Sequence, residues 1–75
     1  MGCYYLIFKS STQVMRADSL LEGSGLRYEI VPVPKAISSE CGLCVRLYGS
    51  LDAALEALHG LKPVAVYDEK FRCIL

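Results

Sequence analysis

The sequence has only one histidine and no excess of either charge. The lack of a second histidine and the lack of a net charge each argue against one class of binding site. Without a second histidine, there is no pair around which a histidine-based metal site could form. Eight basic residues are balanced by eight acidic ones, whereas a protein held on nucleic acid by charge needs clustered Lys and Arg. We therefore expect no DNA or RNA partner.

Long apolar segments are also missing. No apolar run approaches the ~20 residues that a membrane-spanning helix needs, and the first residues contain no basic region followed by a long apolar stretch and a cleavage site. We expect no membrane association and no secretory signal, and therefore a cytoplasmic location. In a reducing compartment, four cysteines in a short chain indicate reactive thiols or a metal site before structural disulfides.

What the sequence does contain is a high apolar content for its length. Hydrophobic residues make up 53% of the 75 residues, and a chain this short buries only about 60% of the surface that it exposes when unfolded. We expect a single domain over residues 1–75, with a core over about 4–67 and a tail over 68–75. Because so small a domain needs further support, we also expect a homodimer.

Apolar periodicity predicts six secondary-structure elements. Ser10 and Gln13 have the spacing of a capping box, and the apolar residues that follow recur at helical spacing until Gly23. A second helical pattern follows Ser50 and stops at Gly60. Alternating or continuous apolar runs predict strands over residues 3–9, 27–33, 43–48 and 63–67.

The resulting order β-α-β-β-α-β is the split βαβ or ferredoxin-like arrangement. It predicts an α+β sandwich in which a four-stranded antiparallel sheet carries two helices on one face. With right-handed crossovers, we expect the strands over 3–9 and 43–48 to be central and to run in the same direction. The other two strands would run the opposite way along the edges, and a homodimer would use the helix-free face or an edge strand.

Four cysteines would then converge at one end of the sheet. The predicted directions place there the starts of the first and third strands and the end of the fourth, near Cys3, Cys41, Cys44 and Cys73. A structural zinc or iron–sulfur site needs four such ligands, but Cys3 and Cys73 lie near the chain ends, and a Cys-x-x-Cys on a strand holds zinc poorly. We expect no metal and no cofactor, with the metal site kept as an alternative.

Cys41 and Cys44 also have the spacing of a redox pair. Such a pair usually opens a helix, whose N-terminus lowers the pKa of the first thiol, whereas the residues here alternate as in a strand. A dithiol redox enzyme is therefore kept only as an alternative, with Cys44 as a possible second thiol. Otherwise Cys44 is interpreted as a sheet residue, Cys3 and Cys73 as incidental small hydrophobes, and His59 as complementing a helix C-terminus.

The segment between the second and third predicted strands carries the candidate site. Pro32 and Pro34 lack a backbone donor and keep the residues before them extended, so the chain leaves its strand here and forms a loop. Cys41 lies in that loop among polar and flexible residues, which a packed core would not supply. We interpret Cys41 as an accessible and reactive thiol.

The cation of Lys35 and the hydroxyl donors of Ser38 and Ser39 could favour the thiolate form of Cys41. Gly42 leaves the sulfur without a neighbouring side chain, whereas the carboxylate of Glu40 would raise the thiol pKa. Arg46 is expected on the same side of its strand as Cys44. The candidate binding residues are two cations, two hydroxyls and the glycine: Lys35, Arg46, Ser38, Ser39 and Gly42.

Residues 4–8 (Tyr-Tyr-Leu-Ile-Phe), 31–34 (Val-Pro-Val-Pro) and 38–42 (Ser-Ser-Glu-Cys-Gly) together resemble a family of small bacterial proteins described as selenium or sulfur carrier-like. The resemblance covers nearly the whole chain and is most specific in the last two segments. It implies that sulfur or selenium is carried on Cys41, and Cys44 is not part of the motif. A carrier holds the atom as a persulfide or selenopersulfide and releases it by thiol attack.

The resemblance therefore implies a carrier or accessory protein more than a stand-alone enzyme, with sulfur or selenium donor and acceptor proteins as partners. It requires no separate general base. The alternative is a ferredoxin-like regulatory or interaction module that dimerises through its sheet and binds a small metabolite or a protein. In that module Cys41 would be replaceable by serine, whereas a carrier would lose transfer.

Overall fold

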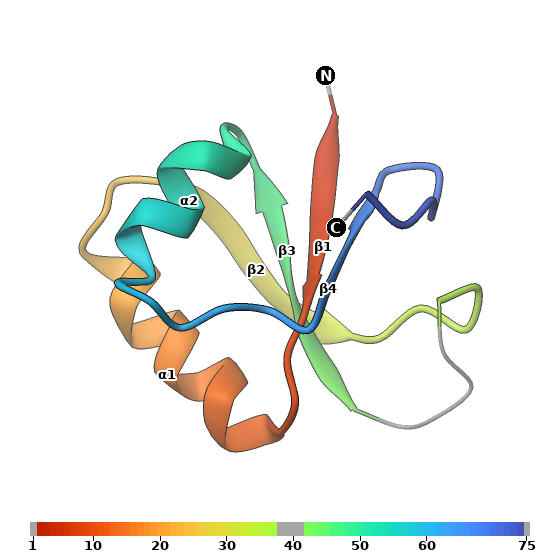
Figure 1. The fold of residues 1–75 in the computed structure, drawn as a ribbon, viewed down its shortest axis with the longest axis horizontal. Helices are drawn as coiled ribbons and strands as arrows, with labels where there is room; N and C mark the ends of the chain where they lie inside the picture. Colours follow the sequence, from red (N-terminus) through yellow and green to blue (C-terminus); the bar gives the residue numbers. More distant parts are fainter. Residues whose placement is uncertain (1, 38–41, 75) are drawn as a thin grey trace.

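The computed structural model describes residues 2–37 and 42–74. Its element order is β-α-β-β-α-β, which confirms the ferredoxin-like α+β arrangement (Figure 1). Within these residues, neither helix has the length and apolar character needed to cross a membrane. The elements are β1 (Cys3–Ile7), α1 (Ser11–Glu22), β2 (Arg27–Pro32), β3 (Leu43–Tyr48), α2 (Leu51–Ala57) and β4 (Ala65–Asp68).

Both helices begin at the serines that the sequence indicates. The Ser10 hydroxyl accepts a hydrogen bond from the Gln13 amide at 3.3 Å, and the Gln13 side chain accepts one from the amide of Lys9 at 3.2 Å. Ser50 caps α2 in the same way, by accepting from the Ala53 amide at 3.3 Å. These bonds satisfy amides that have no partner inside a helix, so the caps fix where each helix starts.

The sheet order is β2-β3-β1-β4, and every neighbouring pair is antiparallel. The central position of β1 and β3 is confirmed, but the prediction that they run in the same direction was wrong: Cys3 faces Tyr48 and Leu6 faces Val45. The reason is the path of the chain. α1 returns it to the starting end of β1, so β2 runs parallel to β1, and β3 then reverses and enters between them antiparallel to both.

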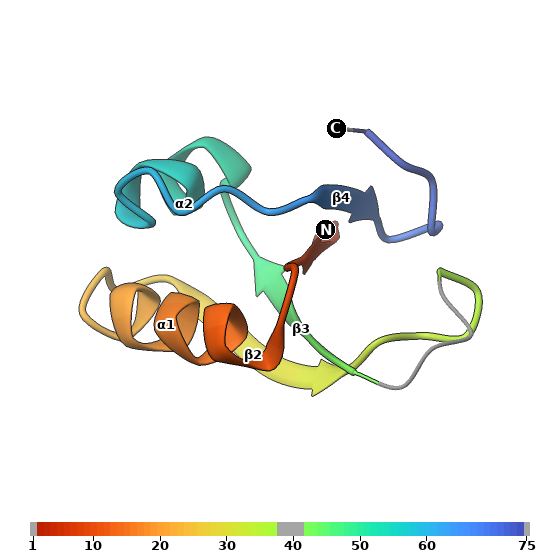
Figure 2. The same ribbon diagram turned by 60° about the horizontal axis from the view of Figure 1, so that its bottom comes forward.

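The two faces of the sheet differ in what covers them. α1 and α2 lie on one side of the sheet, and the described parts of the β2–β3 loop and the C-terminal tail extend away from them (Figures 1 and 2). Because side chains alternate along a strand, each strand contributes to both faces. The main core includes Leu6, Val14, Leu21, Val45, Leu47, Leu58 and Val66.

A smaller buried cluster occupies the helix-free face. We call it the helix-free cluster, and it consists of Cys3, Tyr5 and Cys44. Partly buried apolar residues pack against it, from the strands and from the β2–β3 loop: Ile7, Val31, Val33, Ile37, Tyr48 and Tyr67. The second face is therefore a minor core and not a solvated surface.

The tail after β4 folds back along that strand. The Asp68 amide donates to the carbonyl of Arg72 at 2.9 Å, and the Ile74 amide donates to the carbonyl of Val66 at 2.8 Å. Between them, Cys73 forms an isolated antiparallel bridge with Tyr67. The tail therefore occupies the outer edge of β4.

Candidate functional site

The loop that carries Cys41 has a defined base. The Val33 amide donates to the carbonyl of Gly42 at 2.9 Å, which extends the β2–β3 ladder by one residue pair. A tight turn follows, in which the Ile37 amide donates to the carbonyl of Pro34 at 2.9 Å. Ser38, Ser39, Glu40 and Cys41, which carry part of the predicted site, lie outside the described residues. Gly42, which is peptide-bonded to Cys41, is exposed.

The base of this loop packs against the helix-free cluster, which includes Cys44. Val33 and Ile37 contact the helix-free cluster, and the Cys44 side chain is 0% exposed. Burial raises the pKa of the Cys44 thiol to about 11, because an apolar environment disfavours the charged thiolate. At neutral pH, Cys44 is therefore a protonated and covered thiol, as expected of a sheet residue.

The described cysteines do not gather at one end of the sheet, so the predicted convergence of Cys3 with Cys44 was wrong. Cys3 faces Tyr48 at the end of β3, whereas Cys44 lies near the start of that strand. Tyr5 belongs to the same face and lies between them in the ladder. The cause is the antiparallel direction of β1 and β3. Among residues 2–37 and 42–74, no three His, Cys, Asp or Glu residues are grouped so that they could hold a metal ion.

Arg46 lies on the same face as Cys44, as its strand position predicts. Its guanidinium carbon lies 5.7 Å from the centre of the Tyr5 ring and 5.3 Å from that of Tyr48, distances typical of cation–π contacts. Interaction with the Cys3 side chain, together with Tyr5, raises the pKa of Arg46. The buried Nε atom has no hydrogen-bond partner within the described part of the chain. The Arg46 guanidinium is thus positioned against the rings of Tyr5 in β1 and Tyr48 in β3.

The other two described candidates flank the loop. Lys35 is exposed and lies in the turn that Pro34 and Ile37 close. A Cβ atom built on Gly42 would lie 4.0 Å from Cγ2 of Val33, which is an ordinary contact. Space therefore does not require glycine at position 42. The roles of Lys35, Gly42 and Arg46 toward Cys41 stay predictions.

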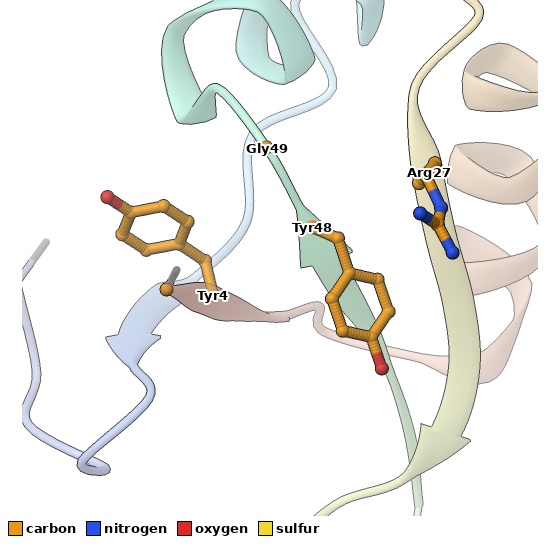
Figure 3. A pocket seen from close by; sticks show the side chains of 5 residues that line it. Tyr4, Arg27, Tyr48 and Gly49 are labelled. Carbon is orange, nitrogen blue, oxygen red and sulfur yellow. The ribbon is translucent and has the colours of Figure 1, made fainter.

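A hollow of about 450 Å³ opens at the other end of the sheet (Figure 3). It is lined by Gly2, Tyr4, Arg27, Tyr48 and Gly49. β3 runs from Leu43 beside the loop to Tyr48 beside the hollow, a span of about 17 Å at the rise of a strand. The hollow therefore lies at the opposite end of β3 from Val33 and Gly42, the described base of the loop. No sequence pattern indicates it, because its lining comes from three strands that only the sheet topology brings together.

Comparison with known proteins identifies the family. The family model described as "Putative Se/S carrier protein-like" matches residues 3–68 of the chain. The chain belongs to this family. No curated protein and no solved structure matches it. The resemblance seen in the sequence is therefore confirmed, and a carrier of this kind interacts with other proteins.

The match to the Se/S carrier-like family also separates the cysteines inside the family region from the one outside it. Its range includes Cys3, Cys41 and Cys44 and leaves out Cys73. Of the three inside it, Cys3 is 9% exposed and Cys44 is 0% exposed. The two described cysteines of the family region are thus both packed into the helix-free face.

Proposed function

We propose that this protein carries sulfur or selenium on Cys41, as a persulfide or a selenopersulfide. One observation carries the proposal: Cys3 and Cys44, the described cysteines in the family region, are buried. A carrier thiol has to be reached first by a donor protein and then by an acceptor protein. Cys41 is the remaining cysteine of that region. Lys35 and Ala36, in the turn before the undescribed segment, are exposed, and so is Gly42, which follows Cys41.

The chemistry needs no reagent beyond the two partners. The Cys41 thiolate attacks the outer sulfur of a donor persulfide, a new S–S bond forms, and the donor S–S bond breaks to release the donor thiolate. An acceptor thiolate then attacks the outer sulfur on Cys41, which returns Cys41 to a thiolate. Each step exchanges one S–S bond for another, so no external oxidant or reductant is consumed. The same steps apply with selenium as the transferred atom.

The residue types close to Cys41 in the sequence suit this role. Lys35 places an exposed cation in the same loop, and Ser38 and Ser39 offer hydroxyl donors; both effects favour a thiolate. Glu40 acts in the opposite direction, because a neighbouring carboxylate disfavours a second negative charge. Cys44 is assigned no transfer step, since its raised pKa and its burial keep it protonated.

Mass spectrometry of the intact protein under non-reducing conditions tests the proposal. After incubation with a low-molecular-weight persulfide donor, the wild-type protein should gain the mass of one sulfur atom, and Cys41→Ser should gain none. Cys73→Ser is the matched control, because Cys73 is exposed but lies outside the family region. Loading of Cys41→Ser to the wild-type level would show that a thiol other than Cys41 carries the sulfur, and loss of loading in Cys73→Ser would assign the carrier site to the tail.

The regulatory-module alternative makes the opposite prediction. A module that binds a metabolite or a protein through its surface would keep its partner when Cys41 is replaced by serine. Retained partner capture by Cys41→Ser, together with no loading of the wild-type protein, would support that alternative. We also propose that the protein stays in the cytoplasm and forms a homodimer.

A further inference from the structure

The two edges of the sheet are not equivalent. The outer edge of β4 is occupied, because the tail pairs with it through the Asp68 and Ile74 amides. β2 is the other edge strand, and β3 is its only ladder partner among the described residues. An edge with unpaired amides and carbonyls is a template for a further strand. The question is therefore which strand fits β2.

The ladder between β2 and β3 determines which backbone groups face outward. The Val33–Gly42 bond joins two directly opposite residues, and hydrogen-bonded pairs alternate with non-bonded pairs along an antiparallel ladder. Val31, Glu29 and Arg27 therefore direct their backbone groups toward β3. The backbone groups of Tyr28, Ile30 and Pro32 point away from the sheet, and Pro32 has no amide to donate.

We propose that two copies of this chain join through their β2 edges, antiparallel, with Tyr28 opposite Tyr28 of the second copy. In this register, the outward amide and carbonyl of each Tyr28 bond to those of the other, and Ile30 lies opposite Leu26. The two sheets then form one continuous sheet of eight strands. The proposal does not depend on the carrier function.

The neighbouring registers are less favourable. A residue whose backbone groups point outward can bond only to an outward-pointing residue of the second copy. Such residues alternate along β2, so the two-fold axis has to pass through a residue and not between two residues. An axis at Glu29 would place two Glu29 carboxylates directly opposite each other, and like charges at that position destabilise a sheet. An axis at Ile30 would set Tyr28 opposite Pro32, which cannot donate, and two bonds of the ladder would be lost.

The axis at Tyr28 instead pairs opposite charges. Arg27 and Glu29 lie on the same face of β2, and this axis brings Arg27 of each copy directly opposite Glu29 of the other. Both side chains are exposed, and Arg27 forms no ion pair within the described part of the chain. Glu29 accepts a hydrogen bond from the Tyr48 hydroxyl at 2.7 Å through Oε1, which leaves Oε2 for the second copy. The edge is thus complementary to itself.

This arrangement keeps the described ends of the two β2–β3 connections apart. In each copy, β2 ends at Pro32, and the two Pro32 residues lie on opposite sides of the axis. Val33 and Gly42, which pair just beyond this strand end, are therefore also on opposite sides of the axis from their counterparts in the second copy.

The test exchanges the charges at positions 27 and 29. Sedimentation equilibrium then measures the mass of each variant at protein concentrations from micromolar to near-millimolar. The wild-type chain should show twice the 8.3 kDa chain mass. Arg27→Glu alone and Glu29→Arg alone each place like charges opposite one another and should weaken self-association by about tenfold or more. An equimolar mixture of the two variants restores opposite charges and should regain the dimer mass, as should the double variant R27E/E29R.

Two controls keep the result specific. Arg16→Glu makes the same change in net charge as Arg27→Glu, at an exposed position on α1, and should leave the dimer intact. Circular dichroism of each variant checks that the fold is retained. A wild-type monomer throughout the range, single variants that dimerise like the wild type, or variants that fail to associate when mixed would each overturn the proposal.

Discussion

The rings of Tyr5 and Phe71 stack on the helix-free face, with their centroids 5.3 Å apart and their planes inclined by 38°. Phe71 reaches this position although its backbone φ is 63°, in the left-handed region that bulky residues rarely adopt. It lies in the turn that the amide of Phe71 closes by donating to the carbonyl of Asp68 at 2.9 Å. The ring contact therefore holds a strained turn, and with it the tail, against the sheet.

Replacing Phe71 should loosen the tail, and two substitutions separate the causes. Phe71→Ala removes the ring contact, which is worth about 0.5–1.5 kcal/mol beyond the buried area, and keeps the strained backbone. Phe71→Gly also removes the ring but tolerates positive φ, so it should be the less destabilised of the two. Hydrogen exchange of the Asp68 and Ile74 amides measures the effect. The control is Met15→Ala, an exposed apolar residue on α1, and equal exchange in all variants would contradict the prediction.

Cys41 should react with alkylating reagents faster than Cys44 at neutral pH. Burial raises the pKa of Cys44 to about 11, so its thiolate is scarce well below that pH. Competitive labelling over a pH series, read out by peptide mass, compares the two thiols in the folded protein. Labelling in denaturant is the control, and there the two cysteines should react alike. Equal rates in the folded protein would show that Cys44 is not protected.

The same thiol should make stability depend on alkaline pH. Well below pH 9, the Cys44 thiol is protonated in both the folded and the unfolded state. Between its ordinary pKa of 9.0 and its raised value of about 11, it ionises in the unfolded chain but not in the folded one. The free energy of unfolding should therefore fall across this window. Urea denaturation of the wild type and Cys44→Ala measures it, and an advantage of the wild type that does not shrink with pH would contradict the assignment.

Tyr28→Phe should destabilise the protein by about 0.5–1.5 kcal/mol, the net value of a typical hydrogen bond. The Tyr28 hydroxyl donates to Oδ1 of Asp18 at 2.5 Å and lies 2.9 Å from the Asp18 carbonyl, which ties β2 to α1. These contacts raise the pKa of Tyr28 to about 12. Tyr67→Phe is the matched control, because no hydrogen bond of the Tyr67 hydroxyl occurs in the described part of the chain. Equal unfolding free energies for Tyr28→Phe and Tyr67→Phe would show that the hydrogen bond between Tyr28 and Asp18 does not stabilise the fold.

Two glycines should respond differently to alanine. Gly49 has φ 135°, which a residue with a Cβ adopts only with strain, so Gly49→Ala should cost roughly 1 kcal/mol or more. Gly42 has an ordinary backbone and room for a Cβ beside Val33. Gly42→Ala should therefore leave the unfolding free energy nearly unchanged, and any loss of sulfur loading in that variant would then come from the site and not from the fold.

Local patterns in the sequence were enough to predict the elements. Ser10 and Ser50 cap the helices where the capping pattern places them, and the strand over 43–48 has the predicted bounds. These features depend on contacts within a few residues, so their signal lies in the sequence itself. The predicted start of the first strand is correct, but its predicted end lies two residues too far along the chain, because the chain turns into the α1 cap after Ile7.

The short segments that carry the family resemblance could also be recognised from the sequence alone. The resemblance rested on short stretches that include Cys41, and the family match over residues 3–68 confirms it. The matched range includes Cys3, Cys41 and Cys44. The assignment of Cys41 gains its weight from the burial of Cys3 and Cys44, which no sequence pattern revealed.

Sequence alone thus determined the order of the elements, their caps and the family, because periodicity and capping act over a few residues. The tertiary structure decided the relations that depend on strand direction. Antiparallel pairing of β1 with β3 separates Cys3 from Cys44. Burial of Cys44 in the helix-free cluster, against which Val33 and Ile37 pack, raises the pKa of its thiol. Residues far apart in the chain produce both effects, since pairing and desolvation arise only when the sheet and its loop are assembled.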